Sequence, residues 1–240
     1  WEDRAPSSVE EIGSVWAEFG VGTECGTLRT VLMHRPGPEI DGITDAARAL
    51  WYDIVDPARA REQHDALTEL YRSHGVVVHE LGETALDKPN SYFCRDIFAM
   101  TPRGVLLSRL ASASRAGEER TAAAALARVG VPIAHSVLGT GTFEGADVAV
   151  VAPDLVFVAE GQRTNREGAR QAAQAFIDAG VEQVFRGFGR GDVARDDLHL
   201  RVVLLDGAHR VAHVARVAVR GVHHQHVDAG LDQAHHALVV

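Results

Sequence analysis

The sequence predicts an α/β protein in which repeated ββαβ units close into a ring, an α/β propeller. Two stretches, beginning near residues 91 and 141, show the same order of strand, turn, strand, helix and strand. Identical residues recur at one offset between them, and the predicted helix of each ends in a Gly-Val pair. One such unit cannot bury both of its faces, so repeated units are expected to stack or to close on themselves.

The first of these stretches opens with "SYFCRDIFAMTPRGVLLSRL", residues 91–110, which predicts two strands joined by a turn at 101–104. The Ala-rich "AGEERTAAAALARVG", residues 116–130, predicts a helix that stops at Gly130. "VPIAHSV" then follows as a third strand.

The second stretch repeats this order. "VAVVA" and "LVFVAE" flank a turn at 153–154, and "REGARQAAQAFIDA" predicts a helix with Asn165 as its N-cap and Gly180 as its stop, before the strand "VEQVF". Four pairs of identical residues are separated by 51 positions: Asp96 and Asp147, Pro102 and Pro153, Arg115 and Arg166, and Gly117 and Gly168. Four matches at one offset indicate an internal repeat.

Further copies of the unit are expected on both sides. An earlier copy is indicated by strands at 27–35 and 76–81 around a helix at 60–75, and a fourth copy begins at 198–217. We expect one domain over residues 1–240. The alternative is an ordinary α/β sandwich in which the polar residues of the repeat cap the ends of strands.

The composition is that of a globular chain that can bury a sizeable core, since 46% of its 240 residues are hydrophobic. Its net charge of −9 argues against a nucleic acid or an anionic membrane surface as the main partner. The longest apolar runs have the length of strands, so no membrane span is predicted and we expect a cytoplasmic protein. Cys25 and Cys94 are too few for a disulfide scaffold and lack metal-ligand spacing. We expect no metal and no other cofactor, and a homodimer is left open.

In a ring, the first residue of each leading strand faces the axis. Asp96, the pair Glu144 and Asp147, and His199 are therefore expected to converge on one central pocket. Only a glycine and an alanine separate Glu144 from Asp147, which lets another backbone or a ligand approach closely.

Carboxylates that converge in a partly desolvated cavity need a cation, and a guanidinium suits them because its N–H donors pair with both carboxylate oxygens. Arg115 and Arg163 lie beyond the second strands of their units, where we expect them to reach a ligand carboxylate at the pocket mouth. An amino acid that carries a guanidine fits both ends. His199, at a strand start, is the candidate general acid and base.

Three segments, "NSYFCRDIFAMTPRG", "TFEGADV" and "RTNREGARQ", resemble the guanidino-group-modifying enzymes in their order and spacing. This family includes dimethylarginine dimethylaminohydrolase, the amidinotransferases and arginine deiminase, and the resemblance extends over residues 26–180. It implies a five-bladed α/β propeller, or pentein, with a guanidine at its centre. It also implies a cysteine thiolate that attacks the guanidinium carbon to give a covalent amidino intermediate.

The resemblance implies a role for each candidate residue. Asp96 would pair with the substrate guanidinium, and Glu144 would hold both that guanidinium and the catalytic histidine, for which His199 is the match. Arg115 and Arg163 would bind the substrate carboxylate. Asp147 is expected beside them as a further substrate-binding residue.

The chain also departs from this family. The family nucleophile lies near the C-terminus, whereas no cysteine follows Cys94 here, so we expect a missing closing blade and a buried structural thiol at Cys94. Trp1 at the start and "HHALVV" at the end fit an incomplete gene product. The His-rich residues 190–240 lack the spacing of a compact metal site, and their composition favours a tail translated out of frame.

The sequence thus predicts a hydrolase of arginine or a methylated arginine that is inactive as it stands because its nucleophile is absent. Two alternatives stay open: an amidinotransferase and a catalytically silent guanidine-binding module.

Overall fold

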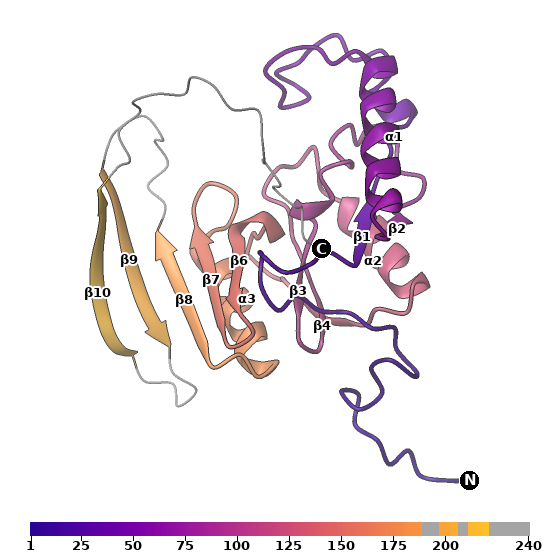
Figure 1. Cartoon of the computed structure of the whole chain (residues 1–240). Coiled ribbons are helices and arrows are strands. Elements are labelled where there is room, and N and C mark those ends of the chain that lie inside the picture. The colour runs from indigo at the N-terminus through magenta and orange to yellow at the C-terminus, as the bar shows by residue number, and fades with distance from the viewer. Residues whose placement is uncertain (189–196, 206–210, 221–240) are drawn as a thin grey trace.

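The ββαβ repeat is visible in the strand pairing of the computed structural model (Figure 1), which describes residues 1–188, 197–205 and 211–220. Its strands form sheets of two, three and five strands. We call the segments Thr30–Glu80, Phe98–Ser136 and Val148–Phe188 units 1, 2 and 3.

Units 2 and 3 have the same topology. Unit 2 contains β3 (Phe98–Thr101), β4 (Gly104–Leu107), α2 (Glu118–Arg128) and β5 (Ile133–Ser136); unit 3 contains β6 (Val148–Ala152), β7 (Leu155–Glu160), α3 (Arg166–Asp178) and β8 (Gln183–Phe188). In each unit the first two strands pair antiparallel and the last two pair parallel. The predicted order of elements and the 51-residue repeat are confirmed by these pairings.

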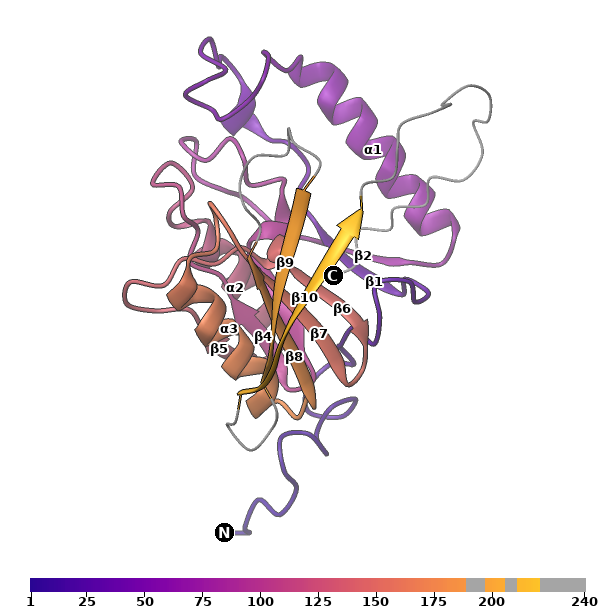
Figure 2. The same ribbon diagram turned by 90° about the vertical axis from the view of Figure 1, so that its left-hand side faces the viewer.

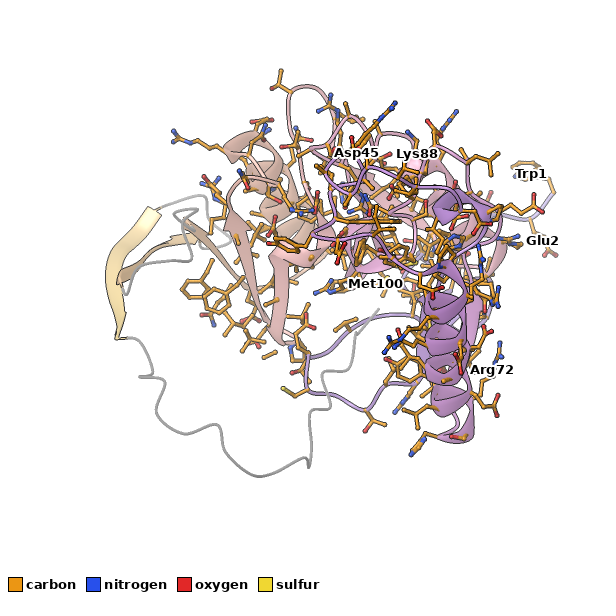
Figure 3. The ribbon with its side chains drawn as sticks, turned by 90° about the horizontal axis from the view of Figure 1, so that it is seen from above. Trp1, Glu2, Asp45, Arg72, Lys88 and Met100 are labelled. Carbon is orange, nitrogen blue, oxygen red and sulfur yellow. The ribbon has the colours of Figure 1, made fainter. Side chains whose placement is uncertain are left out.

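Unit 1 supplies β1 (Thr30–Met33), the 3-10 turn η1 (Pro38–Ile40), α1 (Pro57–Ser73) and β2 (Val77–Glu80), with β1 and β2 parallel. Asp56 caps α1 by accepting hydrogen bonds from two backbone N–H groups of the first turn. Most side chains of α1 are exposed, and Figure 3 shows the helix along one flank of the molecule with Arg72 in its last turn.

The predicted fourth copy is only partly observed. Two strands are present, β9 (Asp197–Leu205) and β10 (Val211–Arg220), and they pair antiparallel. They do not start a separate sheet, because β9 pairs with β8 and the sheet order becomes β10-β9-β8-β7-β6. Figure 2, seen from the side of β10, places both strands in front of the rest of the molecule. The edge of β8 that does not pair with β7 pairs with β9 instead. Closure of the units into a ring stays a prediction.

Two apolar clusters hold the units together. One joins α3 and β6–β8 to Ala99 and Leu106 of unit 2. The other joins α2, β3 and β4 to Leu32 of unit 1 and to Leu81, which directly follows that unit. Each of these helices therefore shares a core with its own sheet and with the preceding unit. Small side chains permit this close packing: a Cβ on Gly168 at the start of α3 would lie 1.8 Å from the carbonyl oxygen of Thr142.

Candidate functional site

Two short 3-10 turns bring the predicted carboxylates together. The turns η2 (Cys94–Asp96) and η3 (Gly145–Asp147) precede β3 and β6, and they contact each other. A Cβ on Gly145 would lie 1.9 Å from the carbonyl oxygen of Phe98, so only glycine fits this position. The expected close backbone approach is confirmed, and the equivalent residues Asp96 and Asp147 lie just before units 2 and 3.

Arg95 fastens the two turns to each other. Its guanidinium donates hydrogen bonds to the carbonyl oxygen of Gly145 at 3.0 Å and to that of Val148 at 2.7 Å. It also pairs with Glu24 at 3.1 Å, and Glu24 in turn accepts the backbone N–H of Val150. Because these bonds are directed to backbone carbonyls, they fix the position of η3 rather than that of one side chain.

Glu144 is the central buried carboxylate of the site. Its side chain is 2% exposed, and its Oε2 accepts a hydrogen bond at 3.0 Å from Nη1 of Arg163, which is 57% exposed. Burial raises the pKa of Glu144, the negative charge of Asp96 adds to this, and Arg163 opposes it. Asp96 and Glu144 thus lie within reach of each other's charge, whereas Arg163, expected at a pocket mouth to bind a ligand carboxylate, pairs with Glu144 instead.

Asp147 is held by a residue that the sequence reasoning missed. The buried hydroxyl of Thr164 donates to Oδ2 of Asp147 at 2.5 Å and accepts the backbone N–H of Glu144 at 3.1 Å. Burial raises the pKa of Asp147, and the hydrogen bond from Thr164 opposes this shift. Thr164 lies directly between Arg163 and the N-cap Asn165, whose side chain accepts the N–H of Gly168 as predicted.

Arg115 differs from its predicted position at a pocket mouth. Its side chain is 2% exposed and bonds Asp96 at 2.5 Å, Glu118 at 2.8 Å and the carbonyl oxygen of Asn90 at 3.3 Å. Although burial lowers the pKa of Arg115, its pairing with Glu118 and Asp96 raises it overall. The first turn of α2 causes the difference, because it places Glu118 three residues beyond Arg115, within reach of its guanidinium. A role in binding a substrate carboxylate stays a prediction.

Asn90 connects this buried pair to the long segment that follows β1. Its side-chain amide donates to the carbonyl oxygen of Ala49 at 2.8 Å and accepts from Nε1 of Trp51 at 2.8 Å. Leu50, between those two residues, has a φ of 63°. A left-handed conformation costs a non-glycine residue about 1–2 kcal/mol, so the two hydrogen bonds offset a strained backbone.

The remaining candidate residues divide into two groups. Cys94 is buried, and its thiol donates a hydrogen bond to the carbonyl oxygen of Ser91 at 3.7 Å. Burial raises the pKa of this thiol to about 12. Both observations fit the structural role predicted for Cys94. His199 lies on β9 opposite Ala218, but its side chain is outside the described part of the structure. The His-rich residues 221–240 also lie outside it.

Two further observations apply to the described residues alone. Among them, no group of three or more His, Cys, Asp or Glu side chains is arranged to hold a metal ion. Within the same ranges, no helix combines the length and the apolar character needed to cross a membrane.

Comparison with protein families gives a match to part of the chain. A family model described as "Arginine deiminase" matches residues 85–188. That range contains Asp96, Glu144 and Asp147 as well as Arg115 and Arg163.

Among curated relatives, the N(G),N(G)-dimethylarginine dimethylaminohydrolase of Streptomyces coelicolor is 31% identical over 157 residues, which are 65% of this chain and 58% of the relative. An arginine deiminase of Mycolicibacterium gilvum is 38% identical over 118 residues, 47% of this chain and 29% of that protein. An uncharacterised protein of Aeropyrum pernix is 37% identical over 51% of this chain and 46% of its own length. The chain thus spans less than two thirds of each of these relatives.

Solved structures show a related fold. The dimethylarginine dimethylaminohydrolase of Pseudomonas aeruginosa, as a cysteine-to-serine variant complexed with citrulline, matches with a TM-score of 0.58 and 24% identity over 70% of this chain and 63% of that one. A dimethylarginine dimethylaminohydrolase adduct with S-methyl-L-thiocitrulline matches over the same shares with a TM-score of 0.57 and 22% identity. The mixed α/β architecture of this chain is therefore that of these proteins.

Proposed function

We propose that this chain, which belongs to the superfamily of guanidino-group-modifying enzymes, binds the guanidinium of arginine or a methylated arginine as the recognition part of a hydrolase. The proposal treats residues 1–240 as one domain. The cytoplasmic location and the homodimer considered from the sequence stay predictions alongside it.

The main observation behind the proposal is that the buried Glu144 carboxylate is paired with a guanidinium, that of Arg163. A buried carboxylate is retained only where a cation or hydrogen-bond donors compensate its desolvation. Here the partner is the half-exposed Arg163, with Nη1 3.0 Å from Oε2. The site therefore already accepts the chemical group that the proposed substrate would present.

Two carboxylates suit the chemistry as well as the binding. Asp96 and Glu144 lie close enough for the charge of Asp96 to raise the pKa of Glu144. A guanidinium between them would be held in its plane and kept positively charged, which makes its carbon more electrophilic. Attack on that carbon would still need a thiolate.

A second candidate function, a guanidine-binding module without catalysis, is favoured by the state of Cys94. Its thiol is 5% exposed, hydrogen-bonded to Ser91 and shifted to a pKa of about 12, so it is protonated at neutral pH. The other cysteine, Cys25, is exposed. Neither cysteine matches the family's nucleophile position.

Calorimetric titration beside a citrulline assay tests both functions. Both predict that the chain binds arginine or dimethylarginine, and release of citrulline would exclude the silent module. Binding without citrulline is expected of the isolated chain under either function, because neither cysteine matches the nucleophile position. The variant Glu144→Gln should abolish binding in either case, because a neutral amide cannot compensate a buried guanidinium. Unchanged affinity in Glu144→Gln, or no binding by the wild-type chain, would refute the proposed function.

A further inference from the structure

We propose that Arg163 is an internal occupant of the guanidinium site, which gives way only to a ligand that carries both a guanidinium and a carboxylate. The ligand guanidinium would take Glu144, and the released Arg163 would take the ligand carboxylate. Arg163 would thereby select zwitterionic guanidino acids over simple guanidines. This inference rests on the proposed function, because it concerns the ligand of the same site.

The two partners of the Glu144–Arg163 pair are held very differently. Glu144 is 2% exposed, its backbone N–H is bonded to Thr164, and the adjacent Gly145 is packed against the backbone of Phe98. Arg163 is 57% exposed, and in the part of the chain that the structure describes its side chain makes one hydrogen bond, to Glu144. When the pair opens, Arg163 is the partner that moves and Glu144 stays in place.

The other guanidinium–carboxylate pair of the site cannot exchange in this way. Arg115 is as buried as Glu144, and it bonds Glu118 as well as Asp96. Its release would take the paired guanidinium from two carboxylates, one of them the fully buried Glu118, a cost that one ligand contact does not offset. The exchange is therefore specific to Arg163.

The balance of contacts explains the selectivity. A ligand with a guanidinium alone replaces one guanidinium on Glu144 by another and leaves Arg163 in water, so little free energy is gained. A ligand with a carboxylate at the other end gives Arg163 a new charge-assisted hydrogen bond. The selection thus arises from competition by Arg163 and not only from its attraction for carboxylates.

Agmatine, which is arginine without its carboxylate, distinguishes these two effects. If Arg163 competes with the ligand, Arg163→Ala should bind agmatine more tightly than the wild-type chain does, by about fivefold for a half-exposed pair. The ratio of arginine to agmatine affinity should fall by about tenfold or more. Removal of a residue that merely attracts carboxylates would leave agmatine binding unchanged.

Arg170→Ala is the matched control. Arg170 is also 57% exposed and also pairs with a glutamate, Glu167, at 2.8 Å, but it lies on the surface of α3. Its removal changes the net charge of the chain by the same amount and should leave both affinities as in the wild type. Any effect of Arg163→Ala that Arg170→Ala reproduces is a general effect of charge.

The experiment is calorimetric titration of the wild-type chain, Arg163→Ala and Arg170→Ala with arginine and with agmatine. Tighter agmatine binding in Arg163→Ala alone supports the inference. Unchanged or weaker agmatine binding in that variant overturns it; if the wild type still binds arginine, the proposed function stands. Absence of binding by all three proteins to both ligands overturns the inference and the proposed function together.

Discussion

The variant Gly145→Ala tests the contact on which the whole site depends. A Cβ at this position would lie 1.9 Å from the carbonyl oxygen of Phe98 and 2.7 Å from that of Arg95, whereas real Cβ atoms essentially never approach within 3.0 Å. The turns η2 and η3 must therefore separate by about 1.1 Å. Both neighbours are backbone atoms, which cannot rotate away as a side chain can.

The expected cost follows from this displacement. Overpacking of a tight contact destabilises a protein by about 1–3 kcal/mol, and a clash with backbone should lie near the upper end. A domain of this size is stable by roughly 5–15 kcal/mol, so the variant should still fold. Because the separation also moves Asp96 away from Glu144, binding of arginine should weaken by about tenfold or more.

Urea unfolding of Gly145→Ala and Gly161→Ala measures the stability effect. Gly161 lies in unit 3, which Gly145 closely precedes, but a Cβ on Gly161 would meet nothing within 4 Å and its φ is not positive. That variant should therefore be neutral or slightly stabilised. Titration with arginine then measures the effect on the site. Equal unfolding midpoints for the two variants, or unchanged arginine binding in Gly145→Ala, would refute the proposed role of this contact.

Three further predictions concern the hydroxyl of Thr164, the carboxyl of Glu160 and the thiol of Cys94. Thr164→Val removes the hydroxyl that bonds Asp147 and the Glu144 N–H, so it should destabilise the chain by about 1–3 kcal/mol, measured by urea unfolding, whereas Thr164→Ser should not. Equal effects of the two variants would contradict this. Burial raises the pKa of Glu160 above its ordinary 4.5, so the folded chain binds this proton more tightly and its contribution to stability falls as the pH rises from 4.5 through the raised value. Glu160→Gln should flatten that fall in urea midpoints, and an unchanged slope would count against the assignment. The isolated chain should release little or no citrulline from arginine or dimethylarginine, and robust turnover abolished by Cys94→Ser would instead make Cys94 the nucleophile.

Local order could be predicted from the sequence because it depends on neighbours in the chain. The offset between Asp96 and Asp147 predicted two equivalent units, and Asn165 predicted the start of a helix; both are observed. The small residue at Gly145 predicted a close backbone approach, which the contact with Phe98 bears out.

Interactions between segments could not be predicted in the same way. A fourth copy of the unit was expected to begin at residue 198, but β9 extends the sheet of unit 3. The sheet that a strand joins depends on which sheet edge is free, and a repeat offset says nothing about edges. Thr164 could not be predicted as a partner of Asp147, because their hydrogen bond joins residues 17 positions apart in the chain. Arg115 is an intermediate case, since the spacing to Glu118 was visible but its burial was not.

The sharing of helices between neighbouring units has a consequence for synthesis on the ribosome. Ala99 and Leu106 belong to unit 2, yet their apolar partners include α3, which is complete only at Asp178, about 40 residues after β5 ends. At roughly 5–20 residues per second, the nascent chain carries that uncovered sheet face for about 2–8 s. During this interval the apolar face of the newest unit is exposed, because the helix that covers it belongs to the next unit. The most recently synthesised part of the chain is therefore the part most prone to non-native contacts.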